Sequence, residues 1–186
     1  MGTMEVTGDE LAGVTDLFGA LTPAELRRAI DELAFKRGEE TPNVPSAIEA
    51  AIEDYRLVAI AVDNGRDVSD SEDDRSEPKD RGETRPTGDD SAHDSRLLVP
   101  GPTAFPTLPA GATDLPHILA IDEREMDRDR LAGSAERRFR VDAARAVADG
   151  DRTEAERLLD VSYDLESWGA LDLADVRDRL DAAADE

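Results

Sequence analysis

The chain has 186 residues, of which 36% are charged and none is cysteine. Acidic residues outnumber basic ones by 45 to 22, so the formal net charge is −23 at pH 7, and 20 of the 22 basic residues are arginine. Without cysteine, the chain excludes disulfides, thiol catalysis, thiolate zinc sites and iron–sulfur clusters. Molar salt shortens the screening length to about 3 Å and removes most of the self-repulsion, so the composition favours a high-salt cytoplasm.

Three short helices are predicted at the N-terminus. Apolar side chains recur at spacings of three and four between residues 9 and 21, which indicates one helix. Thr22 and Glu25 can form a capping box around Pro23, and Gly38 is placed to end this second helix. Ser46 repeats the capping pattern and predicts the start of a third helix.

A β-hairpin is predicted next, with a long charged loop. Residues 57–62 (LVAIAV) are rich in β-branched side chains and lead into Asp63-Asn64-Gly65, which is typical of a strand before a turn. Residues 97–99 are expected to form its antiparallel partner. The intervening residues 66–96 contain 11 acidic and 6 basic residues and almost no apolar ones, so we predict that they are disordered.

Residues 97–121 (LLVPGPTAFPTLPAGATDLPHILAI) form a proline-rich arm. They hold five of the ten prolines and a single charged residue, Asp114. Prolines prevent a regular helix or a central strand, so we expect an extended, buried arm that joins the two halves of the chain. Phe105 is its one aromatic residue, and its ring is expected in the seam between those halves.

The remaining chain is predicted to be helical. A long helix should begin near Asp122 and end near Ala148, with an inward stripe of alanines and Phe139. Thr153 is expected to cap a short antiparallel helix, and Tyr163 and Trp168 to occupy the connection that follows it. Asp172 should cap the last helix.

These elements predict an α+β, mostly helical fold. Residues 1–65 supply three helices and the first hairpin strand, and residues 66–96 are the disordered acidic insert. Residues 97–121 are the second strand and the arm, and residues 122–186 the C-terminal helices. Three helices followed by a hairpin is the element order of a winged helix-turn-helix, so the N-terminal unit is expected to be winged-helix-like.

That order raises DNA binding as a possibility, but the charges fit it poorly. The third helix carries Glu49, Glu53 and Asp54 where a groove-reading helix needs basic or amide side chains. Basic side chains lie on the second helix instead, at Arg27 and Arg28. Protein contacts or self-association are therefore the first interpretation, and a DNA-binding regulator is the alternative.

A cationic patch is predicted on the long C-terminal helix. At 100° per residue, the patch falls in a sector about 100° wide that lies opposite the apolar stripe and contains no acid. It comprises Arg130, Arg137, Arg138 and Arg145. Such a patch can receive phosphate or an acidic protein surface, or it can remain a solvated face that pairs with the protein's own acids.

No catalytic, cofactor or metal site is predicted. His93 and His117 are the only histidines, and no acid or nucleophile is placed to work with either. No phosphate-binding loop, dinucleotide fingerprint or zinc-protease motif occurs, and no small-molecule substrate is evident. The longest apolar run, residues 57–62, is too short to span a membrane, so a soluble intracellular protein is expected.

Three segments carry a family resemblance: LAGVTDLFGALTPAELRRAIDELAFKRGE, the arm, and LLDVSYDLESWGALDLADVRDRL. The chain resembles a family of small acidic proteins of halophilic archaea that has no assigned activity. The resemblance implies a cytoplasmic haloarchaeal protein and supplies no functional residues. The function expected is therefore non-enzymatic, through protein contacts or self-association in a high-salt cytoplasm.

Overall fold

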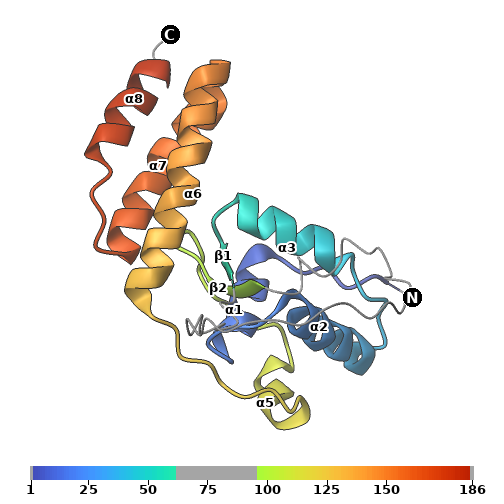
Figure 1. The fold of residues 1–186 in the computed structure, drawn as a ribbon. Coiled ribbons are helices and arrows are strands. Elements are labelled where there is room, and N and C mark those ends of the chain that lie inside the picture. The colour runs from blue at the N-terminus through green and yellow to red at the C-terminus, as the bar shows by residue number, and fades with distance from the viewer. Residues whose placement is uncertain (1, 62–95, 185–186) are drawn as a thin grey trace, which may run out of the picture.

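The structure is a computed structural model that describes residues 2–61 and 96–184 (Figure 1). Its fold is α+β and mostly helical, as predicted. The predicted disorder of residues 66–96 lies outside the described residues, except at Arg96, which begins a strand. The described elements are α1 (Gly8–Asp16), α2 (Pro23–Arg37), α3 (Val44–Glu53), β1 (Leu57–Ala61), β2 (Arg96–Pro100), η1 (Ala112–Asp114), α5 (Leu115–Ile118), α6 (Arg128–Asp149), α7 (Arg152–Trp168) and α8 (Ala174–Ala184).

Local capping signals set the start of the N-terminal helices. The predicted box between Thr22 and Glu25 opens α2, and Gly38 ends that helix in the left-handed conformation. The start predicted for α3 was wrong by three residues. Asn43 is the cap, and its side chain accepts a hydrogen bond from the Ser46 backbone N–H at 3.3 Å. Ser46 therefore lies inside the first turn, after the proline that the helix tolerates there.

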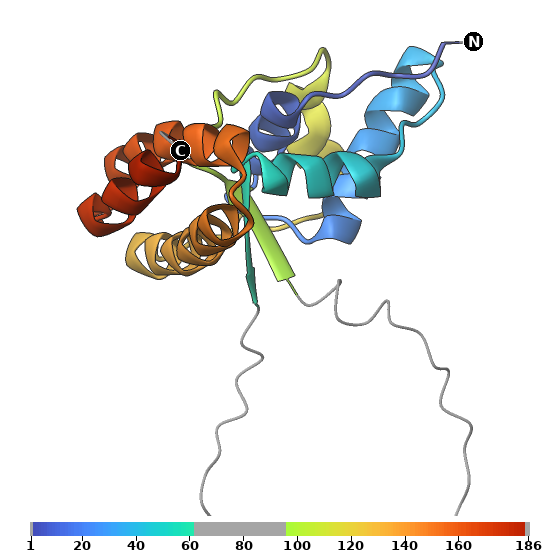
Figure 2. The same ribbon diagram turned by 90° about the horizontal axis from the view of Figure 1, so that it is seen from above.

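The antiparallel hairpin separates two hydrophobic cores. Opposite residues of a pair lie on the same side of the ribbon, and successive pairs alternate between sides. Ala59 faces Leu98 on the side of the N-terminal helices, whereas Val58 faces Val99 on the side of α6, α7 and α8. The hairpin is thus the layer between the two halves, and Figure 2 shows it with helices on either side.

A third backbone segment joins this ribbon. The backbone N–H of Leu21 donates to the Leu98 carbonyl at 3.1 Å, and the Leu98 N–H donates to the Leu21 carbonyl at 2.7 Å. Leu21 lies between α1 and α2, so this bridge ties the first two helices to the hairpin. The N-terminal half consequently has the predicted element order of a winged helix.

After β2, the arm is buried against the N-terminal half, so only its strand residues join the two halves as predicted, with Leu98 in the N-terminal core and Val99 in the C-terminal core. Ala112, Leu115 and Leu119 enter the N-terminal core. Phe105 does not lie in a seam, because its side chain is 78% exposed. The Phe105 backbone N–H donates to the Asp9 carboxylate at 3.0 Å, and the Thr107 backbone N–H donates to the Asp9 carbonyl at 3.1 Å. These bonds hold the arm on α1 while the Phe105 ring faces solvent.

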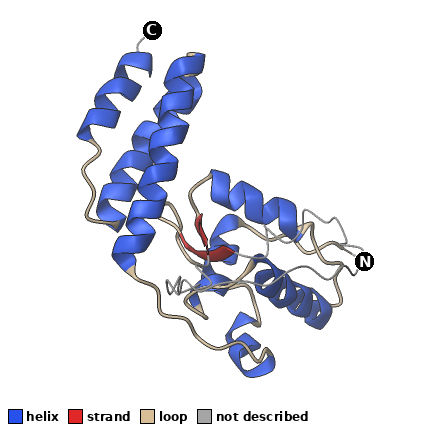
Figure 3. Cartoon of the chain, in the orientation of Figure 1, coloured by secondary structure: helices blue, strands red, loops and turns tan. Residues whose placement is uncertain are grey.

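The C-terminal half is a three-helix unit with boundaries that differ from the prediction (Figure 3). Helix α6 begins at Arg128 rather than near Asp122, because its cap is Asp127 and the preceding residues cross between the halves. Helix α7 is capped by Asp151, not by Thr153, and it continues through Tyr163 and Trp168, which were expected in a connection. The Asp172 side chain accepts from the Ala174 N–H at the start of α8, as predicted.

Candidate interaction surface on helix α6

Helix α6 turns an arginine-rich face away from the C-terminal core. We define the α6 cationic face as Arg130, Arg137, Arg138, Val141 and Arg145. Arg130, Arg137, Val141 and Arg145 are exposed, and Arg138 is half-buried. The helix buries its opposite side, including Phe139 and Ala143, against α7 and α8. The predicted sector therefore exists as a solvent-facing surface.

Two of the four arginines touch the hairpin side of the molecule. Arg130 Nη2 donates to the Ala61 carbonyl at 3.4 Å, at the end of β1. The Arg138 guanidinium lies 4.9 Å from the centre of the Tyr55 ring, in a cation–π contact, and its Nε donates to Asp142 at 3.3 Å. One edge of the face is thereby fixed to the N-terminal half.

Arg137 and Arg145 form the open part of the face. Neither makes an ion pair within residues 2–61 and 96–184, so their guanidinium groups keep their donors free for another molecule. Val141 lies between them along the helix, and 58% of its surface is exposed. This combination of unpaired cations around an apolar side chain is typical of a contact surface.

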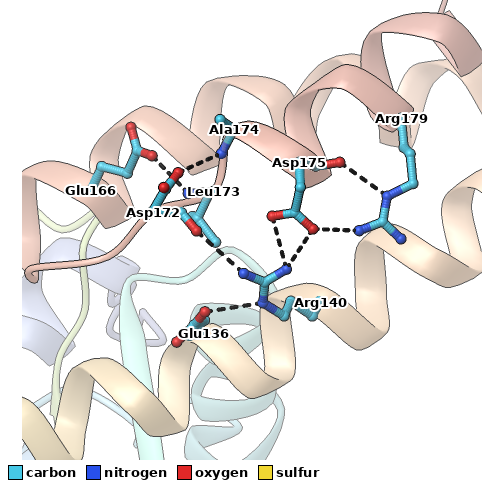
Figure 4. A network of polar contacts seen from close by, with 8 residues as sticks. All are labelled: Glu136, Arg140, Glu166, Asp172, Leu173, Ala174, Asp175 and Arg179. Carbon is cyan, nitrogen blue, oxygen red and sulfur yellow. Dashed lines mark hydrogen bonds and ion pairs between the residues drawn. The ribbon is translucent and has the colours of Figure 1, made fainter.

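Arg140 shows the contrasting case on the neighbouring side of α6 (Figure 4). Its guanidinium bonds Glu136 at 3.0 Å, both Asp175 oxygens at 3.0 and 3.1 Å, and the Asp172 carbonyl at 3.2 Å. Hydrogen bonding from Arg140 holds the pKa of Asp175 below its usual value. The Arg140 guanidinium therefore holds α8 against α6, and its charge is not available to a partner.

Tyr55 anchors the face from beneath. It follows α3 with a positive φ of 58° and is 1% exposed. Its hydroxyl donates to Asp142 at 2.6 Å, and its ring meets Phe139 edge-on at 6.2 Å. Burial raises the pKa of Tyr55, and the Asp142 carboxylate raises it further, so the hydroxyl stays protonated and keeps donating.

A small cleft of about 60 Å³ opens between β1 and α6 beside this anchor. Ala59, Ser134 and Arg138 are among the residues that line it. Leu98 uses its backbone N–H and carbonyl on Leu21, so the backbone groups of Ala59, its partner in β1, face away from β2. The cleft thus combines strand-edge polar groups with a hydroxyl and a guanidinium, and it has room for about two waters or one carboxylate.

Comparison with known families gives one result. A model described as "Family of unknown function (DUF7109)" matches residues 9–185. The chain belongs to DUF7109. No curated protein and no solved structure is significantly similar to it. The membership thus confirms an uncharacterised family and adds no functional residues to this DUF7109 protein.

The N-terminal candidates lie elsewhere in the DUF7109 fold. Arg27 and Arg28 are exposed on α2, and Arg27 pairs loosely with Asp31 at 3.8 Å. Figures 1 and 2 both place α2 on the opposite side of the molecule from α6, so the structure forms two separate cationic regions. The exposed side of α3 includes Glu49 and Glu53 and no cation of its own.

The described residues contain no cluster suited to a metal ion. No group of three or more His, Asp or Glu side chains among them could hold a metal ion. His117 is exposed on α5, and His93 lies outside the described residues. Across the described helices, none combines the length and apolar character needed to span a membrane.

Sequence reasoning found the four arginines through helical periodicity but missed the residues that give the face its form. Val141 is a lone apolar residue in a polar sector and had no pattern to mark it. The bond of Tyr55 to Asp142 joins residues 87 positions apart. No signal local to either residue indicates that bond.

Proposed function

We propose that this DUF7109 protein acts without catalysis, by binding an acidic protein surface through the α6 cationic face. The acidic surface belongs to a partner protein or to a second copy of the chain. One observation carries the proposal: Arg137 and Arg145 flank the exposed Val141 without ion pairs in the described chain, within a protein whose formal net charge is −23. Acids are abundant here, yet Arg137 and Arg145 make no ion pair with any of them among the described residues.

The chemistry of the face suits a carboxylate-rich partner. Guanidinium groups bind carboxylates bidentately, with geometry that a lysine ammonium cannot reproduce. Val141 offers an apolar contact at the centre, where interfaces exclude water. The cleft beside Ser134 and Arg138 has the volume for one carboxylate group, so it can seat a single acidic side chain at the edge of the contact.

A high-salt haloarchaeal cytoplasm is part of the proposal. The net charge of −23 repels itself in dilute buffer, whereas molar salt screens exposed charges beyond about 3 Å. Under such screening, long-range attraction is lost and short-range bidentate bonds remain. Arginine pairs and a buried apolar centre are therefore the contacts that survive there.

DNA binding is the second candidate, and the Leu21–Leu98 bridge favours it. That bridge completes the winged-helix order of the N-terminal half. Against it, Glu49 and Glu53 are exposed on α3, the helix that would enter the major groove, and phosphates would repel them. Arg27 and Arg28 would have to supply the backbone contacts.

Two matched double variants separate these functions. Arg137→Glu with Arg145→Glu reverses the open part of the α6 cationic face, and Arg27→Glu with Arg28→Glu reverses α2. Both change the net charge by the same amount, so each is the control for the other. Each protein would be compared with the wild type by light scattering for self-association, by capture from native lysate in molar potassium chloride, and by anisotropy with labelled duplex DNA.

The expected result is that the α6 variant loses a partner or a dimer that the α2 variant retains. Loss of DNA binding in the α2 variant alone would support the regulator instead. Identical partners, mass and DNA behaviour in all three proteins would contradict both functions.

A further inference from the structure

A second candidate site lies at the junction of the two halves. A pocket of about 250 Å³ opens between the ends of α1, β2 and α7 on one side and the start of α6 on the other. The segment that precedes α6 also lines it. It is an open pocket, and its lining residues come from elements of both halves of the chain. No part of the α6 cationic face lines it.

The walls of this pocket are apolar. Val99 and Leu131 are buried members of the C-terminal core, and Met126 and Trp168 pack partly buried against the same core. Trp168 is the only tryptophan of the chain. Aromatic and aliphatic walls of this kind contribute binding energy by removing the apolar part of a ligand from water.

Three charged residues complete the lining, and two of them are uncommitted. Arg124 is consumed, because it bonds both Glu25 oxygens at 2.7 Å and the Ala20 carbonyl at 2.9 Å. Asp16 and Arg128 are exposed at the rim and make no ion pair with each other or with any other described residue. The pocket therefore presents one free carboxylate and one free guanidinium above an apolar wall.

We infer that this pocket binds a small zwitterion with an apolar side chain, such as an aliphatic α-amino acid. Asp16 accepts hydrogen bonds from the ligand ammonium group, and Arg128 donates to its carboxylate. The side chain packs on Met126, Leu131 and Trp168. The volume lies below the range of about 300 to 1,000 Å³ for drug-sized ligands, so it suits a ligand of amino-acid size.

Binding at this place couples the ligand to the arrangement of the halves. Asp16 ends α1 of the N-terminal half, whereas Trp168 ends α7 of the C-terminal unit. A ligand held between them stabilises the packed arrangement in proportion to its concentration above its Kd. This inference does not rest on the α6 cationic face, so the two can fail separately.

The test uses Trp168 fluorescence in the full chain, with three probes of the same shape. L-leucine carries both charges, 4-methylpentanoate lacks the ammonium group, and isopentylamine lacks the carboxylate. We expect L-leucine to shift the emission saturably and each single-charge analogue to bind at least about tenfold more weakly. Asp16→Asn should weaken leucine binding about tenfold and leave the affinity for 4-methylpentanoate unchanged or tighter. Arg128→Gln should also weaken leucine binding about tenfold, and it should leave the affinity for isopentylamine unchanged or tighter.

Arg27→Gln is the control, because it removes a charge from an exposed helix outside the pocket and should leave every titration unchanged. Circular dichroism of each variant checks the fold, which both rim substitutions should preserve. An absent fluorescence response to L-leucine at about 10 mM would overturn the inference, since it places the Kd above the millimolar range. So would equal affinities for leucine in Asp16→Asn, Arg128→Gln and the wild type.

Discussion

The Tyr55 hydroxyl lies 2.6 Å from the Asp142 carboxylate and joins the α3–β1 junction to the middle of α6. The two residues are 87 positions apart, and Tyr55 is almost completely buried. The same carboxylate also accepts from Arg138, so one group supports both the packing of the halves and one edge of the α6 cationic face. Stability and the proposed binding surface are therefore linked at this point.

Tyr55→Phe should lower the free energy of unfolding by about 1.5 to 3 kcal/mol, the range for a hydrogen bond to a charged group. The ring and its contact with Phe139 remain, so the loss reports the hydroxyl alone. Chemical denaturation followed by circular dichroism measures it. Tyr163→Phe is the matched control, since Tyr163 is 59% exposed and its loss should be within about 0.5 kcal/mol. Equal effects of the two changes would contradict the anchor.

Arg124 clamps the segment that crosses between the halves, and this clamp explains why α6 starts late. Its backbone N–H donates to the Phe18 carbonyl at 2.9 Å, while its guanidinium holds Glu25. Arg124→Gln should lower stability by about 2 kcal/mol. It should also speed protease cleavage in residues 119–127. An unchanged cleavage rate would mean that the segment is held by other contacts.

The same pair predicts a pH dependence. Burial alone would raise the pKa of Glu25, but hydrogen bonds from Arg124 and Thr22 outweigh it and bring the pKa below 4.5. A carboxylate with a lowered pKa in the folded state stabilises the protein above about pH 4.5, and this contribution is lost as the pH falls below that value. Unfolding midpoints measured from pH 6 to pH 3 should therefore fall less steeply in Arg124→Gln than in the wild type. Parallel curves would show that Glu25 gains nothing from Arg124.

Gly13 and Gly133 give opposite predictions for one substitution. Alanine normally stabilises a helix interior by up to about 1 kcal/mol relative to glycine. A Cβ at Gly13 would lie 2.0 Å from the Thr107 carbonyl oxygen, so Gly13→Ala should push the arm off α1 and destabilise the protein. Gly133→Ala meets nothing closer than an Arg137 nitrogen at 3.9 Å and should stabilise it. Thermal unfolding of both variants tests this difference in sign.

Phe105→Ala should change stability by about 0.5 kcal/mol or less, because the ring is exposed. Phe139→Ala should cost about 3 to 5 kcal/mol, because its ring is fully buried against Tyr55. Denaturation of the two variants under one set of conditions provides the comparison. A large loss in Phe105→Ala would restore the role in the seam that the sequence suggested.

These cases show which features local patterns can predict. The Thr22–Glu25 capping box and the helix end at Gly38 involve residues close in sequence, so both can be predicted without knowing the fold. The side of the arm that Phe105 occupies depends on bonds to Asp9, which is 96 positions away. The late start of α6 likewise depends on Arg124 reaching Glu25 across 99 positions. Apolar content predicted that the arm is buried, but not that its residues after β2 pack against the N-terminal half.

The α6 cationic face also combines features that local sequence predicts with features that depend on distant contacts. Its arginines were predictable because helical periodicity alone places them in one sector. Whether each arginine is free or committed could not be predicted, because that depends on the partner element. Arg140 shares the helix with Arg137 but is neutralised by Asp175 of α8, and only the packed structure distinguishes the two.

The most direct test of the proposed function places a photo-crosslinking amino acid at Val141, the exposed centre of the α6 cationic face, and another at Phe35, which is 80% exposed on α2. Both proteins are irradiated in native lysate at molar potassium chloride, and the crosslinked peptides are sequenced. The account predicts that the probe at Val141 captures an acidic segment of a partner or of a second copy, and that Arg137→Glu with Arg145→Glu abolishes this crosslink. The probe at Phe35 should not capture that segment. Failure of the Val141 probe to crosslink, or the same product from both positions, would contradict the central claim.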